Sequence, residues 1–271
     1  MIDHAGVALA AEETGEGAPV VLLHGLTATR RYVVMGSSAL ARSGHRVIAY
    51  DARGHGRSSP APSAAGYTYA ELTLDLKAVL DALGAERVVL AGASMGAHAA
   101  LSFALRAPER VGGLVVITPS YEPDSAGDPV HLARWDALAK GLRSGGIEGF
   151  VAAYGEPRVP PQWRSTVLKV IRQRLALHAH LDAVADALRA VPRSRPFASL
   201  GELEQIAVPV AVVASGDEAD PEHPQAVGRA YAQAIPGARL ISDEPGRSPV
   251  AWQGSRLSRV VAEIAAAAAL G

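Results

Sequence analysis

The chain has 271 residues, of which 49% are hydrophobic and 20% are charged, and its formal net charge at pH 7 is -1. These proportions are those of an ordinary globular protein, and so small a net charge argues against a nucleic-acid partner or an anionic membrane surface. The sequence contains no cysteine, which excludes disulfides, a thiol nucleophile and cysteine-ligated metal, and fits a reducing compartment. The start of the chain lacks the pattern of a signal peptide, and no run of about 18 apolar residues occurs. We therefore expect a cytoplasmic protein that does not cross a membrane.

Strand-like and helix-like patterns alternate along most of the chain, which predicts a parallel sheet covered by helices. The expected strands are an edge strand within Val7–Glu13 and buried strands at Pro19–His24, Arg46–Tyr50, Arg87–Ala91, Gly113–Ile117, Pro209–Ala214 and Arg239–Ser242. The expected helices lie within Arg31–Arg42 and at Tyr69–Leu83, Met95–Arg106, Pro224–Ala234 and Ser255–Ala268, with Thr68 as a cap for the second.

The alternation stops from about Ser120 to Leu203, where the pattern is helical and rich in bulky aromatic residues. We therefore predict the α/β class: a doubly wound, mostly parallel sheet with an all-helical insertion. Residues 1–119 and 207–271 would form the core, and residues 120–206 the insertion.

A candidate nucleophile follows one of the buried strands, in the sequence Gly92-Ala-Ser94-Met-Gly96. A G-x-S-x-G motif between a strand and a helix places its serine on a sharp, strained turn above the carboxyl edge of the sheet. The flanking glycines relieve crowding, and the first turn of the following helix offers N–H groups to a developing oxyanion.

Two further motifs, together with this turn, make the chain resemble the α/β-hydrolase fold family. Leu23–Leu26 is similar to the family's "HG" turn, and Asp51–Ser58 is similar to its "D-x-R-G-x-G-x-S" turn. The resemblance implies that Leu26 and Met95 donate backbone N–H groups to the oxyanion. It also implies that the helical insertion is a cap over the pocket.

The family's catalytic triad runs serine, acid, histidine along the chain. Asp220, which precedes a proline, is nearest to the acid position, and Asp217 and Glu218 remain alternatives. The position of the usual histidine holds Arg247, which stays protonated and cannot accept a proton from serine. Arg247 could instead pair with Asp220 or hold a substrate carboxylate.

A base must then come from elsewhere or be absent. His223, three residues after Asp220, is the candidate for a relocated base, although Asp220 stands so close in sequence that Asp217 is an alternative orienting acid. The alternative reading of His223 is a histidine in a proline-rich surface turn. The remaining candidates are each more often structural in such positions: His24, His55, His98, His178 and His180.

The leading hypothesis is a serine hydrolase that acts on small carboxylic esters or lactones, with Ser94, Asp220 and His223 as the triad. Trp135, Tyr154 and Trp163 would shape an apolar pocket, unless they form the insertion's own core. The alternative is a catalytically degenerate scaffold that binds a small, anionic ligand, or a non-hydrolytic reaction in the same pocket. The sequence implies a small-molecule partner, with no cofactor and no metal site, and leaves the oligomeric state open.

Overall fold

The computed structural model describes residues 1–216, 218, 220–243 and 248–268. Seven strands form the main sheet in the order β3-β5-β4-β6-β7-β8-β9, and all neighbours are parallel except β3 and β5. The strands are β3 (Ala11–Thr14), β4 (Ala18–Leu23), β5 (His45–Tyr50), β6 (Val88–Ala93), β7 (Val111–Ile117), β8 (Val210–Ala214) and β9 (Arg239–Ser242). A separate antiparallel pair consists of β1 (Ile2–His4) and β2 (Val7–Leu9).

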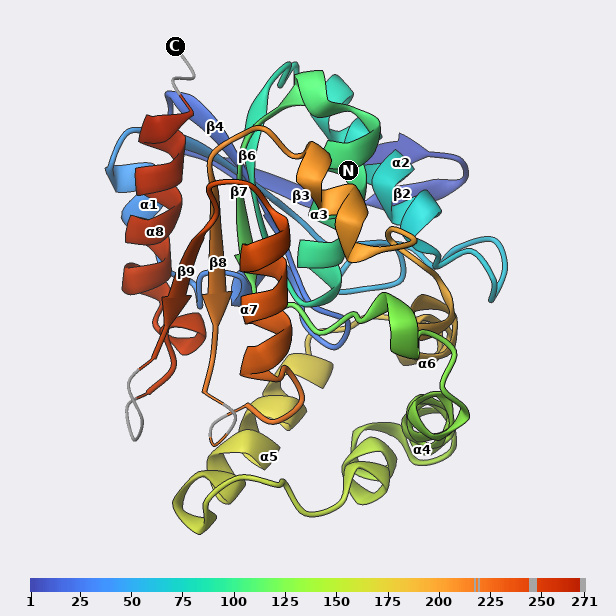
Figure 1. Cartoon of the computed structure of the whole chain (residues 1–271). Coiled ribbons are helices and arrows are strands. Elements are labelled where there is room, and N and C mark those ends of the chain that lie inside the picture. Colours follow the sequence, from blue (N-terminus) through green and yellow to red (C-terminus); the bar gives the residue numbers. More distant parts are fainter. Residues whose placement is uncertain (217, 219, 244–247, 269–271) are drawn as a thin grey trace.

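The central strands are apolar on both faces, as parallel strands covered on both sides must be. Alternate residues of one strand belong to two different cores: Val20 and Leu22 of β4 face one, and Val21 and Leu23 face the other. The first core is closed by α1 (Ala39–Arg42) and α8 (Gly254–Ala267), and the second by α2 (Tyr69–Ala82), α3 (Met95–Arg106) and α7 (Gln225–Ala234) (Figure 1). Because successive side chains of a strand point to opposite faces of the sheet, helices cover both faces. The result is the α/β architecture that the sequence predicts.

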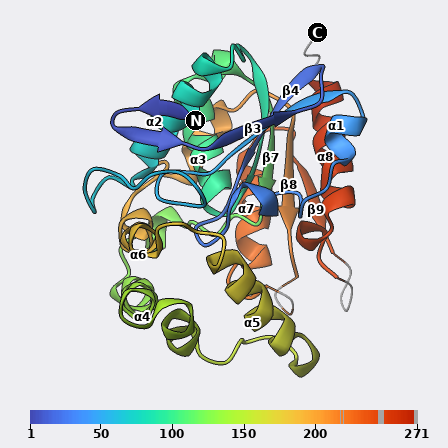
Figure 2. The same cartoon turned by 180° about the vertical axis from the view of Figure 1, so that it is seen from behind.

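The residues between β7 and β8 contain helices and no strand. They form α4 (Pro129–Tyr154), α5 (Pro161–Leu175) and α6 (Leu181–Ala190), with short 3-10 turns at Pro123–Ser125, Val191–Arg193 and Leu200–Gln205. Both views place α4, α5 and α6 together beyond the end of the sheet where β8 terminates, which is its carboxyl edge (Figures 1 and 2). The position above this edge is where a cap would sit, because ligands of open α/β sheets bind there.

Helix α4 is broken within its span at Gly145 and Gly146, whose φ/ψ angles are not helical. The two halves approach closely on either side of the break, since a Cβ at Gly141 would lie 2.4 Å from the carbonyl oxygen of Gly149. Among the helices that the structure describes, none is long and apolar enough to cross a membrane.

Two sequence predictions about elements are confirmed only in part. The helix expected within Arg31–Arg42 is reduced to a 3-10 turn (Arg30–Tyr32) and the four-residue α1, because Met35 and Gly36 have φ values of 48° and 72° that end any helix. The strand expected within Val7–Glu13 is divided at Ala10. The N–H of Ala10 donates to the Ser58 hydroxyl, and its carbonyl accepts from the N–H of Asp51, so the chain changes sheets at this residue.

Candidate active site

Ser94 lies on the sharp turn that the motif predicts, between β6 and α3. Its φ and ψ are 51° and -114°, a region that non-glycine residues rarely occupy, and backbone strain of this kind often occurs at functional sites. The turn is tight on both sides: a Cβ at Gly92 would lie 2.3 Å from the carbonyl oxygen of Gly96, and one at Gly96 would lie 2.2 Å from that of Leu23. Only glycine fits at these two positions, and the partly exposed Ser94 side chain is thereby presented at the carboxyl edge.

An imidazole does approach this serine. The Nε2 atom of His223 lies 3.0 Å from the Ser94 hydroxyl oxygen, and its Nδ1 atom lies 2.9 Å from Oδ1 of Asp220. The three groups therefore form a continuous chain of hydrogen bonds in the geometry of a nucleophile, a base and an orienting acid.

The short spacing between Asp220 and His223 is compatible with this geometry because the two residues close one turn. The N–H of His223 donates to the carbonyl oxygen of Asp220 at 3.1 Å, which places the carboxylate beside Nδ1 of the ring. The other acid candidate at this turn, Asp217, lies outside the described residues, and so does Arg247. Glu218 is exposed.

The surroundings of His223 shift its pKa upward from 6.5. Burial favours the neutral ring, but the charge and hydrogen bond of Asp220, together with the charge of Glu222, outweigh it and favour the protonated ring. A raised pKa suits a general base, which must hold a proton strongly once it has removed it from the nucleophile.

The loop after β4 lies beside the nucleophile, since a Cβ at Gly25 would be 3.5 Å from the Cβ of Ser94. Leu26 follows in this loop, and Met95 is the first residue of α3, so its N–H has no acceptor within the helix. Both N–H groups are therefore candidates for binding an oxyanion, as the family resemblance implies.

Three histidines lie along the carbonyl side of this loop. His24 Nδ1 is 2.8 Å from the oxygen of Gly25, His55 Nε2 is 2.8 Å from that of Leu26, and His178 Nε2 is 3.3 Å from that of Thr27. In a trans peptide the C=O and N–H groups point in opposite directions. By holding the carbonyl oxygens on one side, these rings therefore direct the N–H groups of the loop to the other side. Sequence analysis assigned His24 and His55 structural roles, and their contacts agree with that assignment.

His178 is the member of this group that the sequence could not place, because it comes from the insertion. Its Nδ1 accepts the N–H of Gly56 at 2.8 Å, and the N–H of Ala179 donates to the carbonyl oxygen of Gly56 at 2.8 Å. The insertion is thus joined by hydrogen bonds both to the loop beside Ser94 and to the loop at residues 51–58.

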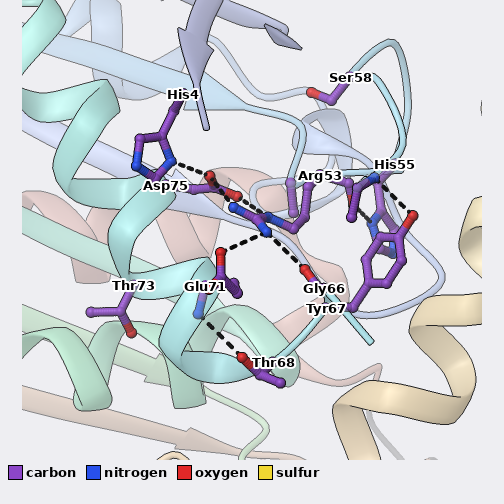
Figure 3. A network of polar contacts seen from close by, with 12 residues as sticks. His4, Arg53, His55, Ser58, Gly66, Tyr67, Thr68, Glu71, Thr73 and Asp75 are labelled. Atoms are coloured by element: carbon purple, nitrogen blue, oxygen red, sulfur yellow. Dashed lines mark hydrogen bonds and ion pairs between the residues drawn. The ribbon is translucent and has the colours of Figure 1, made fainter. Parts of the chain in front are cut away.

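The loop at residues 51–58 is anchored by a buried charged network (Figure 3). Arg53, only 2% exposed, donates through Nε and Nη2 to the two oxygens of Asp75 on α2, and through Nη1 to Glu71 and the carbonyl oxygen of Gly66. His4 Nδ1 lies 2.9 Å from Asp75 as well. The network joins β1, the loop and α2, and has the structural role expected of this motif.

His98, one helical turn after Ser94, belongs to the scaffold. Its Nε2 accepts the N–H groups of Ser120 and Tyr121, so its Nδ1–H faces the Tyr69 hydroxyl at 3.0 Å. Burial lowers the pKa of His98 to about 3, and the ring stays neutral. It holds the start of the insertion against α3.

The aromatic residues of the insertion have different surroundings. Trp135 donates to His131 on the same helix, and Trp163 contacts Trp252 of the core edge to face.

Tyr154 lies close enough to Asp220 for the carboxylate to affect the pKa of Tyr154, which burial raises. Tyr154 also lines a cavity of about 540 Å³ with Arg134 and Glu222, although neither Ser94 nor His223 lines it.

Comparisons with known proteins agree with this architecture. Residues 18–197 match the model of the alpha/beta hydrolase fold family. The chain belongs to the α/β-hydrolase fold family. A protein of Variovorax paradoxus named as a carbamate hydrolase, RutD, is 32% identical over 206 residues, which cover 75% of each chain.

Two solved structures match nearly the whole chain. An esterase from Thermogutta terrifontis, with malate bound, gives a TM-score of 0.78 at 29% identity and covers 95% of this chain and 92% of its own. Est816, described as an enzyme that degrades N-acyl homoserine lactones, gives 0.74 at 27% identity and covers 97% and 98%. The chain is accordingly a hydrolase of this fold.

Proposed function

We propose that the chain is a serine hydrolase of small carboxylic esters or lactones, working through an acyl-enzyme on Ser94. His223 is the general base and acid, Asp220 orients it, and the N–H groups of Leu26 and Met95 bind the oxyanion. The helical insertion acts as the cap that encloses the substrate. The observation that carries the proposal is the 3.0 Å contact between His223 Nε2 and the Ser94 hydroxyl, with Asp220 on the far side of the ring.

The reaction follows from this arrangement. His223 donates Nδ1–H to Asp220, which leaves the Nε2 lone pair free to take the Ser94 proton as the serine oxygen bonds to the carbonyl carbon. The carbonyl oxygen becomes an oxyanion held by the two N–H groups. His223 then returns its proton to the leaving alkoxide, and the acyl-enzyme remains.

A water molecule completes the cycle by the same route. His223 takes one proton from the water as its oxygen bonds to the acyl carbon, and gives that proton to Ser94 when the serine oxygen departs. The products are a carboxylic acid and an alcohol, which are one molecule when the substrate is a lactone. The neutral ring accepts a proton in each attack, and the protonated ring returns it when the leaving group departs. His223 fills both roles, since the sequence has arginine at position 247.

The substrate class draws support from the relatives. One solved neighbour is an esterase crystallised with malate and another degrades a lactone, and the ester and lactone functions share one acyl chemistry. Carbamate hydrolysis is the second candidate, because RutD proteins match the chain at 29–32% identity over 75–86% of its length. A carbamate carbonyl is less electrophilic but would be attacked by the same serine.

The proposal is tested with a fluorophosphonate probe, which labels an activated serine. We expect labelling of the native protein, no labelling of Ser94→Ala, and strongly slowed labelling of His223→Gln. Hydrolysis rates for p-nitrophenyl acetate, a γ-lactone and an N-alkyl carbamate then rank the substrate classes. Labelling that is absent, or that is equal in Ser94→Ala, would exclude the acyl-enzyme and favour a scaffold that only binds its ligand.

A further inference from the structure

Arg174, in the last turn of α5, carries a positive charge into the catalytic end of the insertion. It interacts electrostatically with Asp220, Tyr32 and Tyr154, and it acts on His223 as well. Asp220 and His223 are the proposed acid and base. Tyr32 follows the loop after β4, and Tyr154 belongs to the insertion. Arg174 therefore lies within electrostatic range of the proposed acid and base.

This guanidinium lacks a partner in the part of the chain that the structure describes. Its Nε atom is buried and makes no hydrogen bond, and Arg174 forms no ion pair there. Arg30 offers a contrast: its Nε atom is also buried without a hydrogen bond, but its guanidinium pairs with Asp51 and Glu12.

A buried guanidinium nitrogen in this state is costly, because burial removes hydration that none of the described residues replaces. Burial indeed lowers the pKa of Arg174, with Asp220 acting in the opposite direction, although arginine stays protonated at neutral pH. Asp220 already accepts a 2.9 Å hydrogen bond from Nδ1 of His223, so it does not serve as a dedicated partner for Arg174. An anion carried by the substrate would supply a partner that the described residues do not.

We propose that Arg174 binds a carboxylate on the substrate, so that the preferred substrates are small esters or lactones carrying a negatively charged group. The planar guanidinium matches a carboxylate and holds it in one orientation, which would fix the scissile carbonyl relative to Ser94. This inference rests on the proposed function for its reaction, but the anion site is a separate claim about binding.

The test compares two acyl groups of similar length: p-nitrophenyl valerate, which is neutral, and mono-p-nitrophenyl glutarate, which carries a carboxylate. We expect the native protein to prefer the glutarate ester, and Arg174→Met to reduce the ratio of kcat/KM between the two by about 10- to 100-fold, mostly through KM. Arg174→Lys should recover part of the ratio. Arg172→Met is the matched control, since Arg172 lies on the same helix, is 42% exposed and pairs with Glu148 at 2.7 Å.

A binding experiment separates the anion site from the chemistry. Glutarate, titrated calorimetrically into Ser94→Ala, should bind, and binding should weaken about 10- to 100-fold in the double variant with Arg174→Met. Arg174-dependent glutarate binding without any ester hydrolysis would contradict the proposed function but support the anion site. Equal losses for both esters in Arg174→Met, with glutarate binding absent or unchanged, would overturn the anion site and assign Arg174 to the electrostatics of Asp220 and His223.

Discussion

Ser94 and His223 are 129 residues apart in the chain, yet the serine hydroxyl oxygen and the imidazole Nε2 are 3.0 Å apart. His223 follows Asp220 by three residues in the segment after β8, so one short segment supplies both the proposed acid and the proposed base. This arrangement replaces the more usual one, in which the two come from separate loops.

Removal of the base should abolish most of the activity. For His223→Gln we expect turnover of p-nitrophenyl acetate to fall by about 10⁴- to 10⁶-fold, and for Asp220→Asn by about 10⁴-fold, because the ring loses its orientation and tautomer. His180→Gln is a control, since His180 is exposed. Near-native turnover in His223→Gln would show that another group takes the proton.

The pH dependence of kcat/KM should report His223. The neutral ring is the active form, and its pKa is raised above 6.5, so activity should fall as the pH drops and reach half its maximum above pH 6.5. The Glu222 charge contributes to this shift, and Glu222→Gln should therefore move the midpoint to lower pH. The exposed Glu148, replaced in the same way, serves as the comparison; a profile with no limb above pH 6 would contradict the assignment.

Acid should destabilise the fold through buried neutral histidines. Burial lowers the pKa of His24, His98 and His178 from 6.5 to about 3. Between these values the unfolded chain binds protons that the folded chain does not, so the free energy of unfolding falls as the pH decreases, by about 1.4 kcal/mol per pH unit for each ring. The raised pKa of His223 acts in the opposite sense.

Urea unfolding at pH 7, 6 and 5 measures this slope. In His178→Gln the slope should decrease by about 1.4 kcal/mol per pH unit, because one of these three buried rings no longer contributes. The amide can still accept from Gly56, so the insertion should remain joined to the core. An unchanged slope would mean that His178 is not held neutral in the folded protein.

The Arg53–Asp75 pair should matter far more for stability than a surface pair does. Asp75→Asn leaves a buried guanidinium without its full charge partner and should lower the free energy of unfolding by about 3–5 kcal/mol. Lys77→Met breaks an exposed ion pair with Asp81 on the same helix, and the loss should be below about 1 kcal/mol. Similar losses in the two variants would show that the network in Figure 3 is not an anchor.

Much of the fold could be predicted from the sequence, because its periodicity is local. Continuous apolar runs defined the buried strands, and Met95–Arg106 was confirmed as a helix over its whole predicted length. Thr68 caps α2 as predicted, accepting the N–H of Glu71. The exception within Arg31–Arg42 shows the limit: a left-handed backbone at Met35 is not encoded in a hydrophobic pattern.

The sequence by itself determined the nucleophile turn and the α/β class, since Gly92 and Gly96 are demanded by contacts within a few residues or with the adjoining strand. It narrowed the base to His223 without deciding whether the ring reaches Ser94. Only the tertiary structure decided that contact, along with the placement of His178 on the loop beside Ser94 and the burial of Arg174 Nε without a hydrogen bond to any described residue. These are meetings of side chains from distant segments, and their distances depend on how helices and loops pack, which no local pattern records.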